Sequence, residues 1–354
     1  MHTVDYIIVG QGLAGSAVAV QLLNRGRKIL VIDDAIHNSS SRVAAGLFNP
    51  VTGKKMVKTW MADMLFPYLH DFYKQEETRA EEKFFFPMPL YRPFLSIEEQ
   101  NEWMARSAEP AYAGYIETIF SAPAFAQVRD PFGGLLLKQC GYLSTTRYVN
   151  AIKKRIEDGG MIWNEHLDEQ SLQVEDDAVT YKNVQAKKII YCSGVDASRW
   201  FNWLPIRPLK GETILVKAPF RENIIVNRGV YFVPGLNPGE WRVGATYNFH
   251  DHDPGITAGA KVELEEKLTE LMDLPYEWKS QEWGTRPTTP DRRPILGAHP
   301  EHPSVIIFNG LGTKGVSLTP YFSEVLVRWM ENGISLNKLV DIDRYKSVYW
   351  TSPK

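Results

Sequence analysis

The chain has 354 residues, which predicts two domains at a size of about 150 residues each. Hydrophobic residues make up 44% of the sequence and charged residues 23%, and this balance excludes a disordered or fibrous chain. The net charge of −2 comes from 40 Lys and Arg against 42 Asp and Glu. It excludes a generic nucleic-acid coat protein, although a local basic patch stays open.

Cysteine usage and the absence of long apolar runs predict a cytoplasmic enzyme. Cys140 and Cys192 form no CxxC pair and no zinc spacing, which is typical of a reducing compartment. No apolar run approaches the ~18 residues of a membrane span. The apolar run at 6–9 is also too short for the core of a signal peptide.

The first 34 residues predict a strand, a helix and a second strand. Residues 4–9 are apolar and β-branched, residues 13–24 have a small apolar face, and residues 28–33 end in an acid. The turn between the first strand and the helix is a GxGxxG motif, formed by Gly10, Gly12, Leu13, Ala14 and Gly15 with Gln11. Its glycines allow a pyrophosphate to approach the helix N-terminus, and Asp33 can accept hydrogen bonds from a ribose. Asp33 and Asp34 together disfavour the 2′-phosphate of NADP.

The later segments mix helical and strand patterns. Residues 39–59 are expected to form a Ser-, Gly- and Lys-rich loop, and the three prolines in 84–94 exclude a regular helix there. Helices are predicted at 145–158, at 261–273 and after Gly315, and strands at 188–192, 213–217, 230–233, 241–246 and 305–308.

A second glycine motif occupies 310–315, between a predicted strand and a predicted helix. A second dinucleotide half-site does not fit, because no further strand ending in an acid follows Gly315. We expect its backbone N–H groups and Lys314 to face an anionic group of the one bound cofactor. A reduced flavin carries negative charge at its pyrimidine end, so the loop favours FAD over NAD. A plain strand–helix turn remains the alternative.

Seven blocks in sequence order resemble the D-amino-acid-oxidase superfamily of FAD enzymes. They are the GxGxxG motif and residues 40–47, 141–144, 190–194, 208–212, 243–246 and 284–297. Within the superfamily, the chain is most similar to glycine and sarcosine oxidases and to the FAD domain that oxidises carboxymethylaminomethyl groups on tRNA wobble uridine. Residues 46–50 are nearer the tRNA enzyme.

The resemblance implies a mixed fold, α/β with α+β. A Rossmann-like FAD-binding domain would be assembled from 1–85, 141–212 and 281–354. A substrate domain from 86–140 and 213–280 would carry a mainly antiparallel sheet over the flavin. The FAD would be non-covalent, because both cysteines lie far upstream of the position where some sarcosine-type relatives tether it.

The resemblance also implies residue roles. Ser41, Arg42, Gly46 and Leu47 would lie along the pyrophosphate and flavin, and Ser193 and Gly194 on the far side of the cofactor. The pyrimidine ring would meet Gly310, Gly312, Thr313, Lys314, Gly315 and Val316. Arg286 matches the arginine that binds the substrate carboxylate in glycine oxidases. Tyr231 falls near a substrate-contacting tyrosine, and Arg242 near an oxygen-activating lysine.

Each of these substrate-site roles has a simpler alternative. Arg286 is otherwise a surface or ion-paired arginine, and Tyr231 an ordinary aromatic residue of a half-buried strand. Arg242 is otherwise a solvated strand residue. The run His250-Asp251-His252-Asp253 is expected to be a solvated loop, so we predict no metal site.

The sequence thus predicts an FAD-dependent oxidase or dehydrogenase that acts on the C–N bond of a small amine, an amino acid or N-substituted glycine. Hydride would pass to the flavin, and water would hydrolyse the imine; no side-chain base is assigned. One alternative is oxidation of carboxymethylaminomethyl-uridine in tRNA, with Lys54, Lys55 and Lys58 as phosphate contacts. A non-catalytic flavoprotein subunit is the alternative from another class. The electron acceptor, oxygen or another, is left open.

Overall fold

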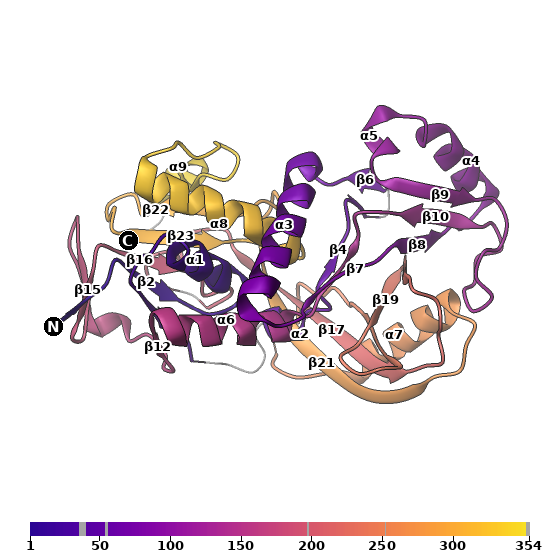
Figure 1. Cartoon of the computed structure of the whole chain (residues 1–354), viewed down its shortest axis with the longest axis horizontal. Coiled ribbons are helices and arrows are strands. Elements are labelled where there is room, and N and C mark those ends of the chain that lie inside the picture. The colour runs from indigo at the N-terminus through magenta and orange to yellow at the C-terminus, as the bar shows by residue number, and fades with distance from the viewer. Residues whose placement is uncertain (35–39, 54–55, 197, 252, 352–354) are drawn as a thin grey trace.

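The computed structural model describes residues 1–34, 40–53, 56–196, 198–251 and 253–351. Figure 1 shows an elongated molecule with one large sheet in each half. Both termini lie in the same half, and helix α3 (Ala62–Ala80) lies between the two halves.

The half that contains the termini is built on a six-stranded sheet. Its first five strands are parallel and the last is antiparallel to its neighbour. Its central strands are fully buried and read as continuous apolar runs, as expected for a sheet covered on both faces. The strand order is β12 (Met161–Trp163), β3 (Ile29–Ile32), β2 (Tyr6–Val9), β16 (Lys188–Tyr191), β23 (Val305–Asn309) and β22 (Ile295–Ala298).

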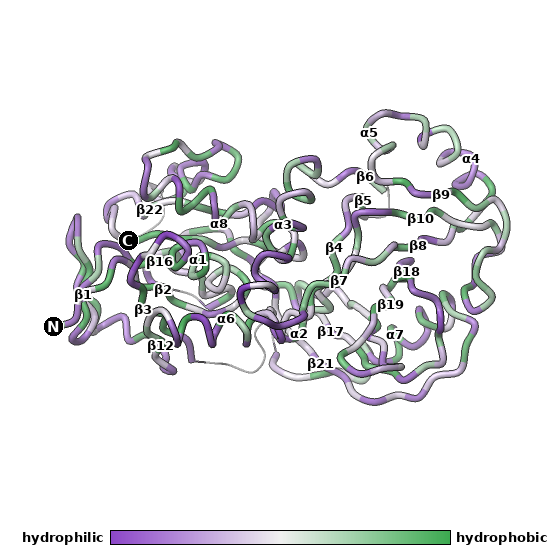
Figure 2. Tube along the Cα trace, viewed as in Figure 1, coloured by the Kyte–Doolittle hydropathy of each residue, from purple (hydrophilic) through white to green (hydrophobic). Residues whose placement is uncertain are grey.

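Three helices accompany this sheet: α1 (Leu13–Leu23), α6 (Thr145–Gly159) and α8 (Gly315–Asn332). Residues 13–22 of α1 are all buried, because the helix is apolar around its whole circumference. Figure 2 shows this apolar character along α1. Helix α8 packs against both α1 and α3, and so connects the sheet to the centre of the molecule.

The other half is built on an eight-stranded sheet that is antiparallel except where β18 pairs with β8. One of its faces is apolar and packs under helix α7 (Ala258–Leu271) through residues such as Ile214, Phe232 and Val243. The order is β21 (Glu277–Thr288), β17 (Arg207–Lys217), β20 (Glu240–Gly244), β19 (Val230–Pro234), β18 (Ile225–Arg228), β8 (Leu90–Pro93), β10 (Gly134–Leu137) and β9 (Ile116–Phe120).

Smaller elements complete the described chain. One sheet contains β1 (His2–Thr3), β15 (Val184–Ala186), β14 (Val179–Tyr181) and β13 (Leu172–Val174), and another contains β4 (Leu47–Phe48), β11 (Gly141–Leu143) and β7 (Phe85–Pro87). Strands β5 (Val51–Thr52) and β6 (Val57–Lys58) pair with each other. The short helices are α2 (Ser40–Val43), α4 (Ile97–Arg106), α5 (Pro110–Ala113), α9 (Lys346–Thr351), η1 (Glu169–Ser171) and η2 (Ile342–Tyr345).

The expected helices and strands are present, and the structure adds elements that were not predicted, among them helix α3. The expectation of a loop over 39–59 is wrong in part, because α2, β4, β5 and β6 lie there. Strand β21 was not predicted, since its sequence is mostly polar and its apolar face is short. The domain boundaries stay a prediction; those expected at 212/213 and 280/281 fall inside the paired strands β17 and β21. Among the described residues, no helix combines the length and apolar sequence that a membrane span requires.

Candidate functional site

Four of the segments predicted to bind a cofactor follow neighbouring strands of the six-stranded sheet. Residues 10–15 follow β2, Asp33 follows β3, residues 192–194 follow β16 and residues 310–315 follow β23. These strands are adjacent and parallel, so the four segments meet at the carboxyl edge of the sheet. This edge is where open α/β sheets bind ligands.

The GxGxxG turn requires glycine for reasons visible in its contacts. A Cβ at Gly15 would lie 1.8 Å from the carbonyl oxygen of Gly10, so α1 begins in direct contact with the preceding turn. Gly10 has φ +91°, a left-handed conformation that favours glycine. The backbone N–H of Gln11 donates to Asp33 Oδ1 over 2.8 Å, which places the acid at the glycine turn. Leu13 and Ala14 are buried in the first turn of α1.

Helix α2 lies against this turn. Ser41 Oγ accepts a hydrogen bond from the backbone N–H of Leu13 over 3.0 Å, so its hydroxyl sits at the N-terminus of α1. Arg42 donates to Asn150 Oδ1 over 3.2 Å. A Cβ at Gly46 would lie 1.8 Å from the carbonyl oxygen of Leu143, so glycine is needed there to bring two backbones together. Leu47, next in sequence, is half-buried in β4.

The segments after β16 and β23 join the same edge. Asn309 Nδ2 donates to the carbonyl oxygen of Gly194 over 2.7 Å, and Ser193 Oγ donates to the carbonyl of Asp196 over 3.1 Å. A Cβ at Gly315 would lie 3.2 Å from Leu13 Cδ1, so the N-termini of α8 and α1 lie side by side.

The remaining residues of the second glycine motif differ in exposure. Gly310 and Gly312 both have positive φ, +74° and +54°. Thr313 is exposed, whereas Val316 is buried in α8 and its carbonyl accepts a hydrogen bond from Tyr73.

Lys314 is a half-buried cation at this edge. Its Nζ donates to Thr52 Oγ1 and to Thr59 Oγ1, each over 3.2 Å. Burial lowers the pKa of Lys314, and the positive charge of Arg292 lowers it further. An ammonium held by neutral hydroxyls in a buried position gains from an anionic ligand. Thr52 and Thr59 could not be identified from the sequence, because they lie far from the glycine motif in the chain.

The three residues predicted to contact substrate all lie on the face of the eight-stranded sheet opposite α7. Alternation along the strands puts Ile214, Phe232 and Val243 under α7. Arg286, Tyr231 and Arg242 therefore point from the other face. The register pairs Thr213 with Gly244, and Gly244 with Tyr231.

Arg286 is half-buried. Its Nη1 is buried and has no hydrogen-bond partner among the residues that the structure describes. A Cβ at Gly211 would lie 2.1 Å from this Nη1, so the guanidinium lies directly over the glycine of the neighbouring strand. The ring of Tyr247 lies 5.2 Å from Arg286 Cζ, within the range of a cation–π contact. A buried, unpartnered guanidinium N–H is suited to donate a hydrogen bond to an anionic group.

Tyr231 presents its hydroxyl to the same face. A Cβ at Gly244 would lie 2.6 Å from the Tyr231 oxygen, so this glycine leaves room for the phenol. Burial raises the pKa of Tyr231 to about 12, although Arg286 and Arg242 nearby act in the opposite direction. The phenol is therefore a neutral hydrogen-bonding group at ordinary pH.

Arg242 connects four segments. Its Nη1 donates to Thr213 Oγ1 over 3.1 Å and to the carbonyl of Val43 over 3.3 Å, and it also forms an ion pair with Glu282. The alternative of a solvated strand residue is therefore wrong, because only 16% of the side chain is exposed. Glu282 was not identified from the sequence, because its partner Arg242 lies on β20, 40 residues away in the chain and on the other side of β17.

Further contacts attach this sheet face to the cofactor-binding segments. The backbone N–H of Gly312 donates to the carbonyl of Pro287 over 2.9 Å, next to Arg286. A Cβ at Gly284 would lie 3.4 Å from Val43 Cβ, so α2 packs directly on β21. The strands that carry the predicted substrate residues therefore pack against the segments that carry the predicted cofactor residues.

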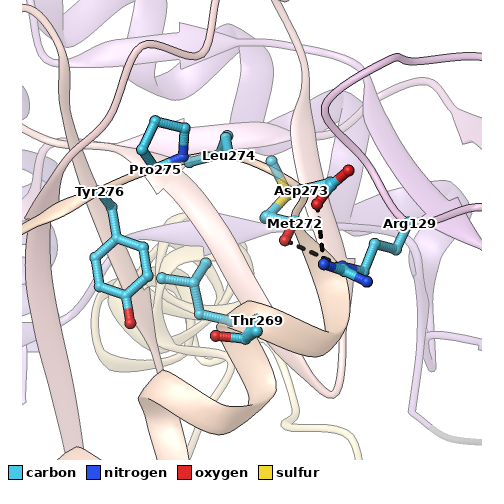
Figure 3. Close-up of a pocket in the computed structure, with 8 residues that line it drawn as sticks. Arg129, Thr269, Met272, Asp273, Leu274, Pro275 and Tyr276 are labelled. Carbon is cyan, nitrogen blue, oxygen red and sulfur yellow. Dashed lines mark hydrogen bonds and ion pairs between the residues drawn. The ribbon is translucent and has the colours of Figure 1, made fainter.

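A hollow lies away from these residues, beside the C-terminal end of α7. It has a volume of about 270 Å³ and contains none of the predicted site residues. Figure 3 shows Arg129 directed at Asp273, with an Nη2–Oδ1 distance of 2.9 Å. Because α7 covers the opposite face of the sheet from Arg286, this hollow is separate from the site.

The predicted loop at 250–253 and the lysine patch are described only in part. Within the run 250–253, Asp251 forms an ion pair with Lys210 Nζ over 2.6 Å. Among the described residues, no three His, Cys, Asp or Glu side chains come together as a metal site would require. Lys58 pairs with Asp63 over 2.6 Å. His252, Lys54 and Lys55 lie outside the described residues.

Comparison with known proteins identifies the family. The model of the FAD dependent oxidoreductase family matches residues 5–329. The chain belongs to this family. Its FAD-binding oxidoreductase character, expected from the sequence, is thereby confirmed.

Individual relatives agree with the family. The chain is 24% identical over 352 residues to the glycine oxidase of Geobacillus kaustophilus, covering 90% of each chain. The crystal structure of glycine oxidase from the same organism superimposes with a TM-score of 0.79 at 20% identity, covering 95% of this chain and 96% of that one. This likeness confirms the mixed fold.

A longer relative shares only part of its length with this chain. The tRNA 5-methylaminomethyl-2-thiouridine biosynthesis bifunctional protein MnmC of Hydrogenovibrio crunogenus is 24% identical over 326 residues, which cover 83% of this chain. The chain spans about half of that protein, 47% of its length.

The residues at the sheet edge fit FAD. The Gly15 and Gly12 contacts leave no space for side chains at the start of α1, which is what close approach of a pyrophosphate requires. Asp33 is positioned by Gln11 at the same turn, and Lys314 supplies a positive charge at the neighbouring helix N-terminus. The assignment of individual residues to parts of FAD remains a proposal.

Proposed function

We propose that this protein oxidises the C–N bond of an amino acid or N-substituted glycine, with non-covalent FAD as the electron acceptor within the protein. The observation that carries the proposal is the buried Nη1 of Arg286, which lacks a hydrogen-bond partner among the described residues. A guanidinium offers a planar pair of donors that matches a carboxylate. The similarity to glycine oxidase over 90% of both chains supports an amino-acid substrate.

The chain's own residues bind and orient the substrate in this proposal. Arg286 holds the carboxylate, and the glycine beneath it, Gly211, allows the guanidinium to lie flat on the sheet. Tyr231 supplies a neutral hydroxyl on the same face. Arg242 joins the sheet to α2 through the carbonyl of Val43, so it keeps the substrate face in position over the cofactor segments. Orientation of this kind accounts for much of the barrier reduction in bound reactants.

When bound, FAD would supply two-electron acceptance: it would take a hydride from the C–H beside the amine nitrogen and leave an imine for water to hydrolyse. No side-chain base is assigned, because a substrate that binds as the neutral amine has no proton to lose before hydride transfer. Lys314 lies at the edge where the anionic reduced ring is proposed to sit, and its positive charge would stabilise that form.

Anaerobic bleaching of the flavin tests the proposal. We expect purified protein to be yellow, to release FAD on acid denaturation, and to lose its absorbance when a substrate among glycine, N-methylglycine, proline or D-amino acids is added. Flavin left attached to the precipitated chain would contradict non-covalent binding. An intact flavin spectrum with every free amine and with modified tRNA would contradict catalysis, and would favour a non-catalytic flavoprotein subunit.

A tRNA substrate is the second candidate, because MnmC is among the relatives. A carboxymethylaminomethyl group is itself an N-substituted glycine, so Arg286 would hold its carboxylate in the same way. The net charge of −2 gives this candidate little support, and a small-molecule substrate is favoured. Bleaching by modified tRNA but by none of the free amines would reverse this preference. The external electron acceptor and the cytoplasmic location stay predictions.

A further inference from the structure

We propose that Glu282 restricts the site to substrates with a single carboxylate, by neutralising Arg242, the second of the two guanidinium groups that reach over β17. This inference rests on the proposed function and names the substrate class more narrowly. It follows from the charged side chains that the eight-stranded sheet presents on the face opposite α7.

The two guanidinium groups converge on one strand. Arg286 reaches from β21 and lies over Gly211, with Nη1, Nη2 and Cζ all within 2.6 Å of the position of a Cβ there. Arg242 reaches from β20 and donates to Thr213 Oγ1 over 3.1 Å. Gly211 and Thr213 are two residues apart on β17, so the groups are separated by about 7 Å at the strand rise of ~3.3 Å per residue. The two carboxylates of a small dicarboxylic amine would span such a distance.

The two groups differ in their partners. Arg286 Nη1 is buried and has no hydrogen-bond partner among the described residues. Arg242 is ion-paired with Glu282, whose side chain extends from β21 on the same face. One guanidinium is thus available to an anionic ligand, while the charge of the other is already balanced.

The two charged residues next to Gly211 on β17, Lys210 and Glu212, do not alter this balance, because their side chains lie on the α7 face of the sheet. Lys210 pairs with Asp251, and Glu212 accepts a hydrogen bond from the side chain of Thr257 at the N-terminus of α7. A second substrate carboxylate near Arg242 would meet the carboxylate of Glu282 and be repelled. Since 45% of the Glu282 side chain is exposed, solvent screens part of this repulsion, and we expect a moderate effect.

The test compares substrates that differ by one carboxylate. Anaerobic flavin reduction is measured with N-methylglycine against iminodiacetate, and with D-alanine against D-aspartate. In whichever pair contains a substrate, the wild-type protein should have the higher kcat/KM for the monocarboxylate. In Glu282→Gln, the ratio of kcat/KM for the dicarboxylate to that for the monocarboxylate should rise about tenfold.

Three variants identify the cause of the shift. Glu282→Asp keeps the charge and should keep the wild-type ratio. Glu277→Gln removes an acid of the same strand whose partner is the exposed Lys279, and should also leave the ratio unchanged. The gain of Glu282→Gln should disappear in the double variant Arg242→Gln/Glu282→Gln. FAD content per chain is measured in every variant, so that cofactor loss is separated from a change in preference.

A wild-type preference for the dicarboxylate would overturn the inference. So would a ratio in Glu282→Gln that stays within twofold of the wild-type ratio. If none of the four compounds reduces the flavin in any variant, and glycine and proline do not reduce it either, the proposed function itself fails, which is a different result from an unchanged ratio.

Discussion

The guanidinium of Arg286 lies on the bare backbone of Gly211, with Nη1 2.1 Å from the point that a Cβ would occupy. The two residues are 75 positions apart in sequence and lie on adjacent antiparallel strands, where Gly211 pairs with Gly284. Because neither glycine has a side chain, the side chain of Arg286 can lie directly on the backbone of β17. The position of the proposed carboxylate-binding group therefore depends on a residue with no side chain.

Substitution of Gly211 tests this dependence. In Gly211→Ala, the new methyl group would push the guanidinium away, because that end of the arginine is what the Cβ meets. Displacement of a substrate-orienting group by about 1 Å predicts a fall in kcat/KM of roughly tenfold to hundredfold for an amino-acid substrate. FAD content should not change. Gly259→Ala is the control, since its Cβ would have no atom within 4 Å. Equal activity of the two variants would refute the role of Gly211.

Tyr231 is expected to act as a neutral donor. Its pKa of about 12 lies above that of an ordinary tyrosine, so the hydroxyl keeps its proton from pH 7 to 10. Tyr231→Phe should lower kcat/KM about threefold to tenfold, the value of one hydrogen bond. The loss should be the same at each pH in this range, because the raised pKa places the titration above it. A basic limb that is present in the wild type and missing in the variant would mean that Tyr231 acts as an ionised group.

Asp33 is expected to hold the ribose of FAD. Its Oδ1 accepts a hydrogen bond from the backbone N–H of Gln11, which places the carboxylate at the glycine turn. Loss of hydrogen bonds to a charged acceptor predicts that Asp33→Ala weakens FAD binding by about 1.5–3 kcal/mol. Titration of apoprotein with FAD measures the change in Kd. Asp34→Ala is the control, because Asp34 pairs with His166 at 3.1 Å and is expected to leave the affinity unchanged. Wild-type affinity in Asp33→Ala would remove this residue from the cofactor site.

The parts of the fold that were predictable depend on local sequence. The GxGxxG turn, its flanking strands and Asp33 lie within 34 residues, and their spacing alone indicates a dinucleotide site. The central strands were also predictable, because strands buried on both faces are continuously apolar. Strand β21 is not buried on both faces. It is polar on the face that forms the site, so its sequence resembles a loop.

The contacts that define the site were not predictable from the sequence, because they join distant segments. Arg286 was identified by resemblance, but the register that places it over Gly211 appears only in the structure. The same holds for the pairing of Arg242 with Glu282, and for Thr52 and Thr59 around Lys314. Pairing between strands is set by tertiary packing, which periodicity in one segment does not report.

The most direct test of the central claim removes the guanidinium of Arg286 and varies the substrate. kcat/KM is measured for an amino-acid substrate and for the corresponding amine without the carboxylate, in wild type, Arg286→Lys and Arg286→Ala. We predict that Arg286→Ala loses about 2–5 kcal/mol of transition-state stabilisation with the amino acid, by analogy with a broken buried charge pair. Arg286→Lys should be impaired as well, because it keeps the charge but loses the second donor. The amine should be nearly unaffected and the FAD content normal. Equal losses on both substrates would contradict the account, because a group that binds the carboxylate has no effect on a substrate that lacks one.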